Sequence, residues 1–211
     1  SLGGGVNRYF GRHFGQVLWV KNYTGDITPE HEYYRNNGAK NDANIYLKAE
    51  YRPIECLNIY ADAQYRHIGY RIDGNNDKWN DATDSHQQLA IDEKFNFFNP
   101  KAGISYLPDS NNRLYASVGV AHKEPTRNNY TDGKLDEHPT AERLIDYEAG
   151  YIYSGRLFTA GANIYFMDYK DQLVLTGELN EIGEPLAANI PKSYRAGIEL
   201  TAGLQLPCGF G

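Results

Sequence analysis

Cysteine is scarce in this sequence, and the cysteines present show no pattern. The 211 residues include two cysteines, Cys56 and Cys208, and neither belongs to a CxxC pair or to a Cys/His spacing typical of metal sites. We therefore expect both to be incidental turn residues, and we expect no metal centre and no cofactor. In the topology predicted below they lie several strands apart, too far for a disulfide.

Long apolar runs, basic clusters and catalytic motifs are also missing. No stretch approaches the roughly 18–20 apolar residues that a spanning helix needs, which excludes a helical membrane protein. The formal net charge of -6 is spread along the chain, so nucleic acid is not expected as a partner. No serine lies in a GxSxG sequence, and no Ser/His spacing supports a catalytic site. We therefore expect no catalytic residues and no enzyme.

Tyrosine and alternation with a period of two are abundant. The 18 tyrosines outnumber 8 phenylalanines and 2 tryptophans, and tyrosine suits membrane interfaces because its ring is apolar and its hydroxyl is polar. The clearest alternation runs over residues 57–67. One face carries Leu57, Ile59, Ala61, Ala63 and Tyr65, and the other carries Asn58, Tyr60, Asp62, Gln64 and Arg66. One face suits lipid and the other suits water, as in a strand of a membrane barrel.

Seven or eight segments follow this pattern and predict strands. Up to Lys40 the pattern is irregular, and there we expect the end of one strand, a strand at Gln16–Lys21, a large loop and a turn at Asn37-Gly38. The later strands are expected at about residues 44–52, 57–67, 95–107, 114–120, 145–153, 158–169 and 194–205.

The connections between these segments alternate in length. Short turns are expected at about residues 52–56, 108–112 and 154–155, and long loops at about 73–93, 124–142 and 179–189. In outer-membrane barrels the short turns face the periplasm and the long loops face outside.

The predicted fold is all-β, as part of an antiparallel transmembrane β-barrel. Charged side chains avoid the apolar register, where an Arg or Lys facing lipid would cost about 2–4 kcal/mol. A soluble sandwich would need a core for both sheets and rarely keeps runs this long. Charges occupy the lumen-facing register instead, where ion pairs between neighbouring strands would hold them. These are Lys48, Glu50, Arg52, Asp62, Arg66, Lys101, Arg113, Asp146, Glu148, Arg195 and Glu199.

Four motifs in the second half resemble the barrel of TonB-dependent outer-membrane receptors. Lys123-Glu124-Pro125 stands where that family has a Phe-Arg-x-Pro-like motif at a strand end, although it departs from the pattern. Glu142 with Tyr147-Glu148-Ala149-Gly150 stands where the next strand opens. The segments Asn163–Leu173 and Asn189–Glu199, the latter with Gly197-Ile198-Glu199, continue the resemblance in the same order.

The resemblance implies a 22-stranded barrel filled by an N-terminal plug, of which residues 1–211 would supply roughly a third. The plug, the TonB-binding box and the closing strands would lie outside this sequence, which we expect to be an internal fragment. The whole receptor would sit in the outer membrane, among its lipid. It would import a scarce nutrient such as a ferric siderophore, haem or cobalamin with energy relayed by the TonB complex through the plug. The alternative is a plugless porin or a small eight-stranded adhesin-type barrel, which seven or eight strands could close.

Aromatic and histidine residues of the outer loops are the candidates for contacting a nutrient cargo. The main ones are Trp79, His86, Tyr130 and His138, and a wider set adds His13, Trp19, Tyr33 and Tyr34. Loop packing, or a tyrosine girdle at the membrane interface, is the structural alternative.

Two further features suggest metals only weakly. His67 and His122 lie where strands leave the membrane and could ligate a metal, but their spacing is no metal motif and favours rim histidines. Residues 73–84 place oxygen-bearing side chains as a calcium loop would, yet Lys78 replaces the required glycine and Asp84 the bidentate glutamate. We expect a solvated acidic loop.

Overall fold

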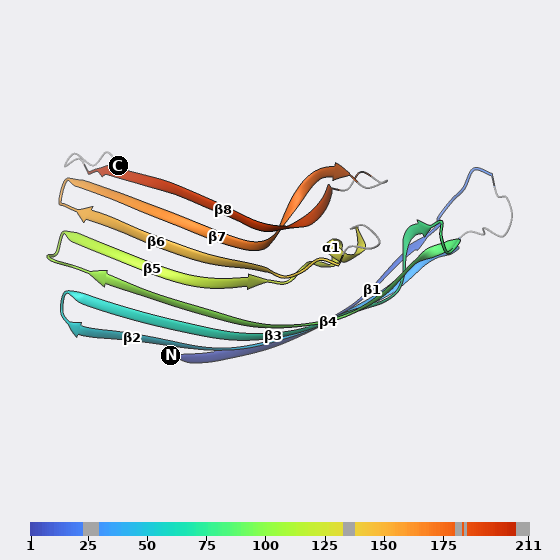
Figure 1. The fold of residues 1–211 in the computed structure, drawn as a ribbon, viewed down its shortest axis with the longest axis horizontal. Helices are drawn as coiled ribbons and strands as arrows, with labels where there is room; N and C mark the ends of the chain where they lie inside the picture. Colours follow the sequence, from blue (N-terminus) through green and yellow to red (C-terminus); the bar gives the residue numbers. More distant parts are fainter. Residues whose placement is uncertain (23–29, 133–137, 180–182, 184, 206–211) are drawn as a thin grey trace.

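The computed structural model describes residues 1–22, 30–132, 138–179, 183 and 185–205, which form one antiparallel sheet of eight strands in sequential order (Figure 1). The strands are β1 (Leu2–Gln16), β2 (Glu32–Ile54), β3 (Leu57–Asn80), β4 (Ser85–Tyr106), β5 (Asn112–Lys123), β6 (Glu142–Ser154), β7 (Phe158–Leu179) and β8 (Pro185–Leu204), with a short helix α1 (Arg127–Thr131) after β5. No helix among these residues is long and apolar enough to cross a membrane. The all-β antiparallel prediction is confirmed.

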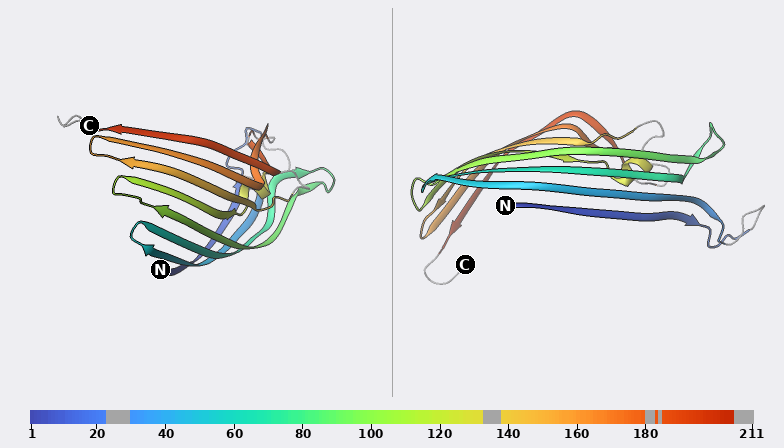
Figure 2. Two further views of the ribbon diagram at one scale, coloured as in Figure 1. Left: turned by 60° about the vertical axis from the view of Figure 1, so that its left-hand side comes forward. Right: turned by 90° about the horizontal axis from the view of Figure 1, so that it is seen from below.

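The sheet is bowed and open. Its three short connections, after β2, β4 and β6, gather at one end, and the longer strands extend toward the other (Figures 1 and 2). One face is therefore concave, as in part of a barrel wall. Within the described residues no pairing joins β1 to β8, so the idea that these strands close by themselves is wrong. Cys56 lies in the first short turn with a free thiol, and Cys208 lies outside the described residues.

Alternation sorts side chains onto the two faces as expected. On the outward face, Ile198 and Leu200 of β8 are 70% and 76% exposed, and Phe98 and Ile164 are also exposed. The outward apolar stretches cover residues 145–153 of β6, 158–166 of β7 and 194–204 of β8. These match the roughly 9–11 residues that a tilted strand needs to cross the hydrocarbon layer.

Tyrosine–glycine pairs recur across the inner face. Each pair consists of direct register partners, and the tyrosine ring covers the glycine so closely that a Cβ there would overlap ring atoms. Such rings shield the bare glycine backbone and pin the register of the two strands. The pairs are Gly3–Tyr46, Gly15–Tyr34, Tyr60–Gly103, Tyr115–Gly150 and Tyr165–Gly197.

The strands run much further beyond the apolar band than predicted. The loop expected at 73–93 is wrong, because β3 and β4 stay paired until Asn80 meets Ser85 across a tight turn. The loop expected at 179–189 is shorter, because β7 continues to Leu179 and β8 begins at Pro185. Backbone pairing explains both corrections: a ladder already in register continues with polar residues on both faces once water can hydrate them.

The first forty residues also differ from expectation. Asn37 and Gly38 do not form a hairpin turn but pair with Arg12 and Gly11 in the middle of a β1–β2 ladder. The strand expected at Gln16–Lys21 is wrong as well, since β1 ends at Gln16 and residues 17–20 form no strand. Glycines and aromatics hid the alternation of β1, because its inner register is largely glycine.

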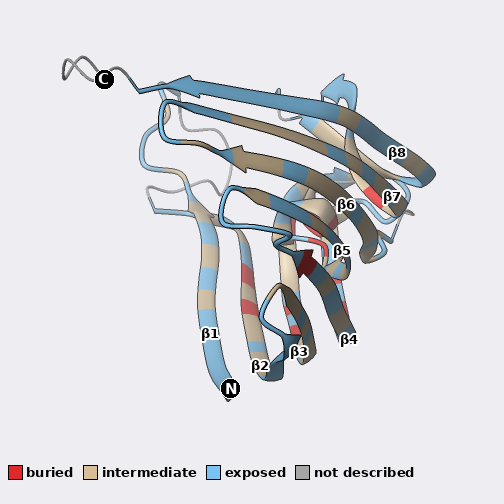
Figure 3. Ribbon diagram, turned by 90° about the vertical axis from the view of Figure 1, so that its left-hand side faces the viewer, coloured by how far each residue is buried: buried red, intermediate tan, exposed pale blue. Residues whose placement is uncertain are grey.

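A small apolar core lies on the inner face of the extended half of the sheet. Buried residues occur on β2–β4 and not on β1 or β8 (Figure 3). The largest buried cluster consists of Tyr70, Ile72, Leu89, Ile91 and Tyr130. Burial there explains why this hairpin keeps its strand form outside the membrane.

Candidate functional site

The segment that follows β5 folds back over the concave face and is held there by ion pairs. The Glu124 carboxylate accepts hydrogen bonds from Lys40 Nζ at 2.5 Å and Arg66 Nη1 at 3.0 Å. Arg66 also pairs with Asp42 at 2.5 Å, as expected for charges of neighbouring strands on the lumen side. This Glu124 network joins β2, β3 and the segment after β5 in one polar bridge.

Glu124 keeps its charge although it is largely buried. Its side chain is 12% exposed, and this burial raises the pKa. The hydrogen bond from Lys40 and the charges of Lys40 and Arg66 outweigh burial, so the pKa of Glu124 lies below its usual value. Breaking the network would leave two cations facing each other without the carboxylate between them.

Helix α1 continues this segment across the inner face. Thr126 begins the helix and donates its backbone N–H to Asn129 Oδ1 at 2.8 Å. Arg127 then donates to Asn36 Oδ1 at 2.6 Å. Tyr130 packs its ring 5.8 Å from that of Tyr70, and burial raises the pKa of the Tyr130 hydroxyl. The helix therefore closes the apolar cluster from the lumen side.

A polar hollow of about 440 Å³ lies beside the Glu124 network. Its walls include Asp42, Asn44, Gln64 and Arg66 from the inner faces of β2 and β3. A hollow with both charges and amides offers hydrogen-bond partners to a polar ligand or to protein in the lumen.

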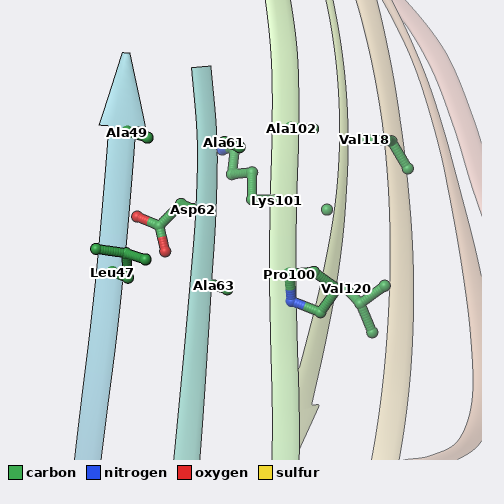
Figure 4. Close-up of a pocket in the computed structure, with 11 residues that line it drawn as sticks. Leu47, Ala49, Ala61, Asp62, Ala63, Pro100, Lys101, Ala102, Val118 and Val120 are labelled. Atoms are coloured by element: carbon green, nitrogen blue, oxygen red, sulfur yellow. The ribbon is translucent and has the colours of Figure 1, made fainter.

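A second hollow, of about 360 Å³, has the opposite character. Small apolar residues of β2–β5, among them Ala61, Ala63, Ala102 and Val118, line it (Figure 4). These side chains belong to the outward register, so the hollow faces the bilayer and would receive a lipid chain.

The predicted cargo residues separate into different places. Trp79 and His86 are register partners at the tip of the β3–β4 hairpin, with ring centroids 5.2 Å apart in an edge-to-face arrangement. Trp79 is 52% exposed. Tyr130 lies on α1 and is buried between the helix and the sheet instead of lining a surface, and His138 is exposed. Among the described residues, no hydrogen bond or ring contact joins these last two to the hairpin tip.

The wider set of candidates also divides. Tyr33 and Tyr34 pack edge to face at 5.2 Å, and Trp19 is exposed beyond the end of β1. His13 is half-buried on the inner face, where burial and the charge of Arg127 lower its pKa. Among the described residues, no ring contact joins Trp19 or His13 to the Tyr33–Tyr34 pair.

The two rim histidines and the calcium-like segment do not assemble a metal site. His67 Nδ1 contacts Asn96 Oδ1 at 2.8 Å, and His122 Nδ1 contacts Asn99 Oδ1 at 2.9 Å. Residues 73–80 are extended in β3, which spreads their oxygens along a strand, so the solvated loop expected there is a hairpin. Within the part of the chain that the structure describes, no group of three His, Cys, Asp or Glu side chains could hold a metal ion.

Sequence reasoning missed the Glu124 network as a unit. Lys40 and Glu124 are 84 positions apart, and Lys40 sat in a stretch without visible alternation. In the sequence, Glu124 stands out only through the Lys123-Glu124-Pro125 motif. That motif indicates the family but does not predict that Lys40 and Arg66 are the ion-pair partners.

Comparison with known proteins decides the family. The family described as "TonB dependent receptor-like, beta-barrel" matches residues 2–211. The chain belongs to the TonB-dependent receptor family. It is therefore an outer-membrane protein of a transporter family, not an enzyme.

Solved structures of this family share the fold. The chain resembles the FrpB iron transporter from Neisseria meningitidis (TM-score 0.60, 18% identity, covering 81% of this chain and 24% of that one). It also resembles the copper transporter OprC (TM-score 0.67, 15% identity, 98% and 33%) and the ferric yersiniabactin receptor FyuA from Yersinia pestis (TM-score 0.60, 19% identity, 86% and 27%). The chain thus spans about a quarter to a third of these receptors. No curated protein matches its sequence.

Proposed function

We propose that this chain is one wall segment of the barrel of a TonB-dependent receptor that binds and imports a scarce nutrient. The family match across residues 2–211 carries the proposal. An open sheet with exposed outer edges fits a segment of a larger barrel of about 22 strands. The plug that would fill this barrel and contact TonB belongs to other parts of the receptor.

We propose a ferric siderophore as the first cargo class. Haem and cobalamin are the alternative cargoes. Iron transport and ferric yersiniabactin uptake are named for FrpB and FyuA, and copper for OprC. At 15–19% identity these structures share only the fold with this chain. The cargo proposal is therefore supported by family membership and not by shared binding residues. The exposed Trp79 ring, packed against the half-buried His86 at the hairpin tip, would meet a flat or chelated ligand first.

The inner face would serve the plug. The polar hollow beside Asp42 and Arg66 and the ion-paired Glu124 segment present charges of both signs to the lumen. A plug with complementary polar groups would pack there without burying unpaired charge.

The test uses the full-length receptor that contains this segment, purified in detergent. Binding of defined ferric siderophores, haem, cobalamin and cupric ion is measured by calorimetry, and uptake of the ligand that binds is compared in cells with and without TonB. We expect submicromolar binding of one ligand and uptake that stops without TonB. Equal uptake in both strains, with passage of unrelated small solutes, would establish a plugless pore instead.

A further inference from the structure

Three basic side chains form an unbroken lateral row on the outward face. Register pairing places Arg143 of β6 opposite Lys170 of β7, and Lys170 opposite Lys192 of β8. Each lies in the outward register of its strand, above an apolar stretch, with Asp168 between that stretch and Lys170 on β7, and all three are exposed. Direct cross-strand partners have Cβ atoms about 4.5–5.5 Å apart, and like charges at that distance repel.

Acidic side chains do little to offset this row. Lys170 has Asp171 at 3.9 Å, and among the described residues Arg143 and Lys192 make no ion pair. Asp168 shares the face one position nearer the membrane but forms no ion pair with the row within the described chain. Elsewhere on the outer face the opposite arrangement holds, with Arg71 directly opposite Asp92.

The height of the row on the barrel identifies what could neutralise it. On β6 and β8 the row follows directly on the outward apolar stretches, and on β7 only Asp168 lies between; the length of these stretches matches the hydrocarbon layer. The short turns mark the periplasmic end, so the row lies at the outer leaflet. Groups at that level are the headgroups of outer-leaflet lipids.

We propose that Arg143, Lys170 and Lys192 form a binding site for the phosphate groups of an outer-leaflet lipid. Ammonium and guanidinium groups donate charge-assisted hydrogen bonds to phosphate oxygens. The acyl chains of the same lipid would lie along the apolar stretches beneath the row. This inference needs only the outer-membrane location of the chain and is independent of the cargo.

The test measures lipid binding to the full-length receptor after delipidation in detergent. Lipid A carrying its phosphates is titrated, and bound copies are counted by native mass spectrometry; dephosphorylated lipid A and inorganic phosphate are titrated separately. The test variant is Lys170→Gln/Lys192→Gln. The matched control is Arg52→Gln/Arg156→Gln, which removes as much charge at the opposite rim. Lys170→Arg/Lys192→Arg keeps the charge.

We expect the affinity for phosphorylated lipid A to fall about tenfold to thirtyfold in the test variant, since each basic residue at a charged lipid surface contributes about 1 kcal/mol. The control and the arginine variant should bind as the wild type does. Unchanged affinity in the test variant, or equal binding of dephosphorylated lipid, would overturn the proposal. Displacement of the lipid by an equal concentration of inorganic phosphate would assign the row to free phosphate instead.

Discussion

At the scale of single residues, glycine positions without a side chain contribute to strand register as much as polar and apolar side chains do. Five inner-face glycines of the described strands accept tyrosine rings from the neighbouring strand. The tyrosines can be counted in the sequence, but the sequence does not show which glycines they cover. Their pairing depends on register, which alternation leaves open by steps of two residues.

Gly150→Val should destabilise the barrel because its side chain would displace the Tyr115 ring, whose hydroxyl donates to Asn163 Oδ1 at 3.0 Å. We expect a loss of about 1–3 kcal/mol in the free energy of unfolding, the usual cost of overpacking. Urea denaturation of the receptor in vesicles measures it. Gly69→Val is the control, since no atom lies within 4 Å of a Cβ there. Equal stability of the two variants would contradict the ring-on-glycine account.

Glu124→Gln should release the segment after β5 at neutral pH. Neutralising the carboxylate leaves Lys40 and Arg66 without their shared partner, at a cost of about 1–3 kcal/mol. A spin label at the exposed Asn128 reports the change as increased mobility. Glu50→Gln is the control, because Glu50 is half exposed and pairs with Lys48 at 3.5 Å. An immobile label in Glu124→Gln would show that the ion pairs do not hold the segment.

Acid should release the same segment in the spin-labelled protein that retains Glu124. The pKa of Glu124 is lowered in the folded state, so its stabilisation is complete above the ordinary glutamate value of 4.5 and is lost as pH falls through the folded value. We expect the Asn128 label to stay immobile at pH 5 and to become mobile only below pH 4.5. Release above pH 6 would point to a different titrating group.

At the scale of elements, hairpins replace the expected loops. The polar residues of 73–93 show no alternation, so the sequence predicts a loop, yet β3 and β4 carry their pairing through to Asn80 and Ser85. Alternation of apolar and polar residues appears where one face of a strand is apolar and the other is hydrated. In a hairpin whose outer side is hydrated by water this alternation is weak. Trp79 and His86 thereby meet at one tip, a pairing that the loop prediction did not contain.

Trp79→Ala should lower cargo affinity without unfolding the receptor. The ring contact with His86 is worth about 0.5–1.5 kcal/mol, and the tip lies outside the membrane band, so the barrel should stay intact. We expect about a tenfold weaker binding of the cargo, measured by calorimetry. Phe158→Ala removes a similarly exposed aromatic ring, 47% against 52%, at the opposite rim and should leave affinity nearly unchanged. Equal losses in both variants would remove the special role of the tip.

At the scale of the whole molecule, the sheet is incomplete by itself. The free edges of β1 and β8 expose backbone donors and acceptors, and the outward face exposes large apolar side chains. In water the open edges can pair with other chains, and the outward apolar side chains can associate with one another.

The isolated chain should therefore aggregate in water. We expect sedimentation velocity of residues 1–211 without detergent to show large, heterogeneous species, and detergent to disperse them. A control in the same buffer is the full-length receptor in detergent, which should sediment as a uniform particle. A stable, detergent-free monomer of this chain would contradict its role as part of a membrane barrel.

The sequence by itself determined the fold class and, from about residue 44 onward, the two faces of the strands and which of them pair across short turns, because alternation is a local property and short turns force neighbouring strands to pair antiparallel. It also carried the family, through motifs that keep their order along the chain. Only the tertiary structure decided that Glu124 meets Lys40 and Arg66, that tyrosines cover glycines, and that three basic residues align on the outer face. Each of these depends on register or on a fold-back between distant segments. Such contacts depend on how all the strands pair. The alternation within any single strand does not encode that pairing.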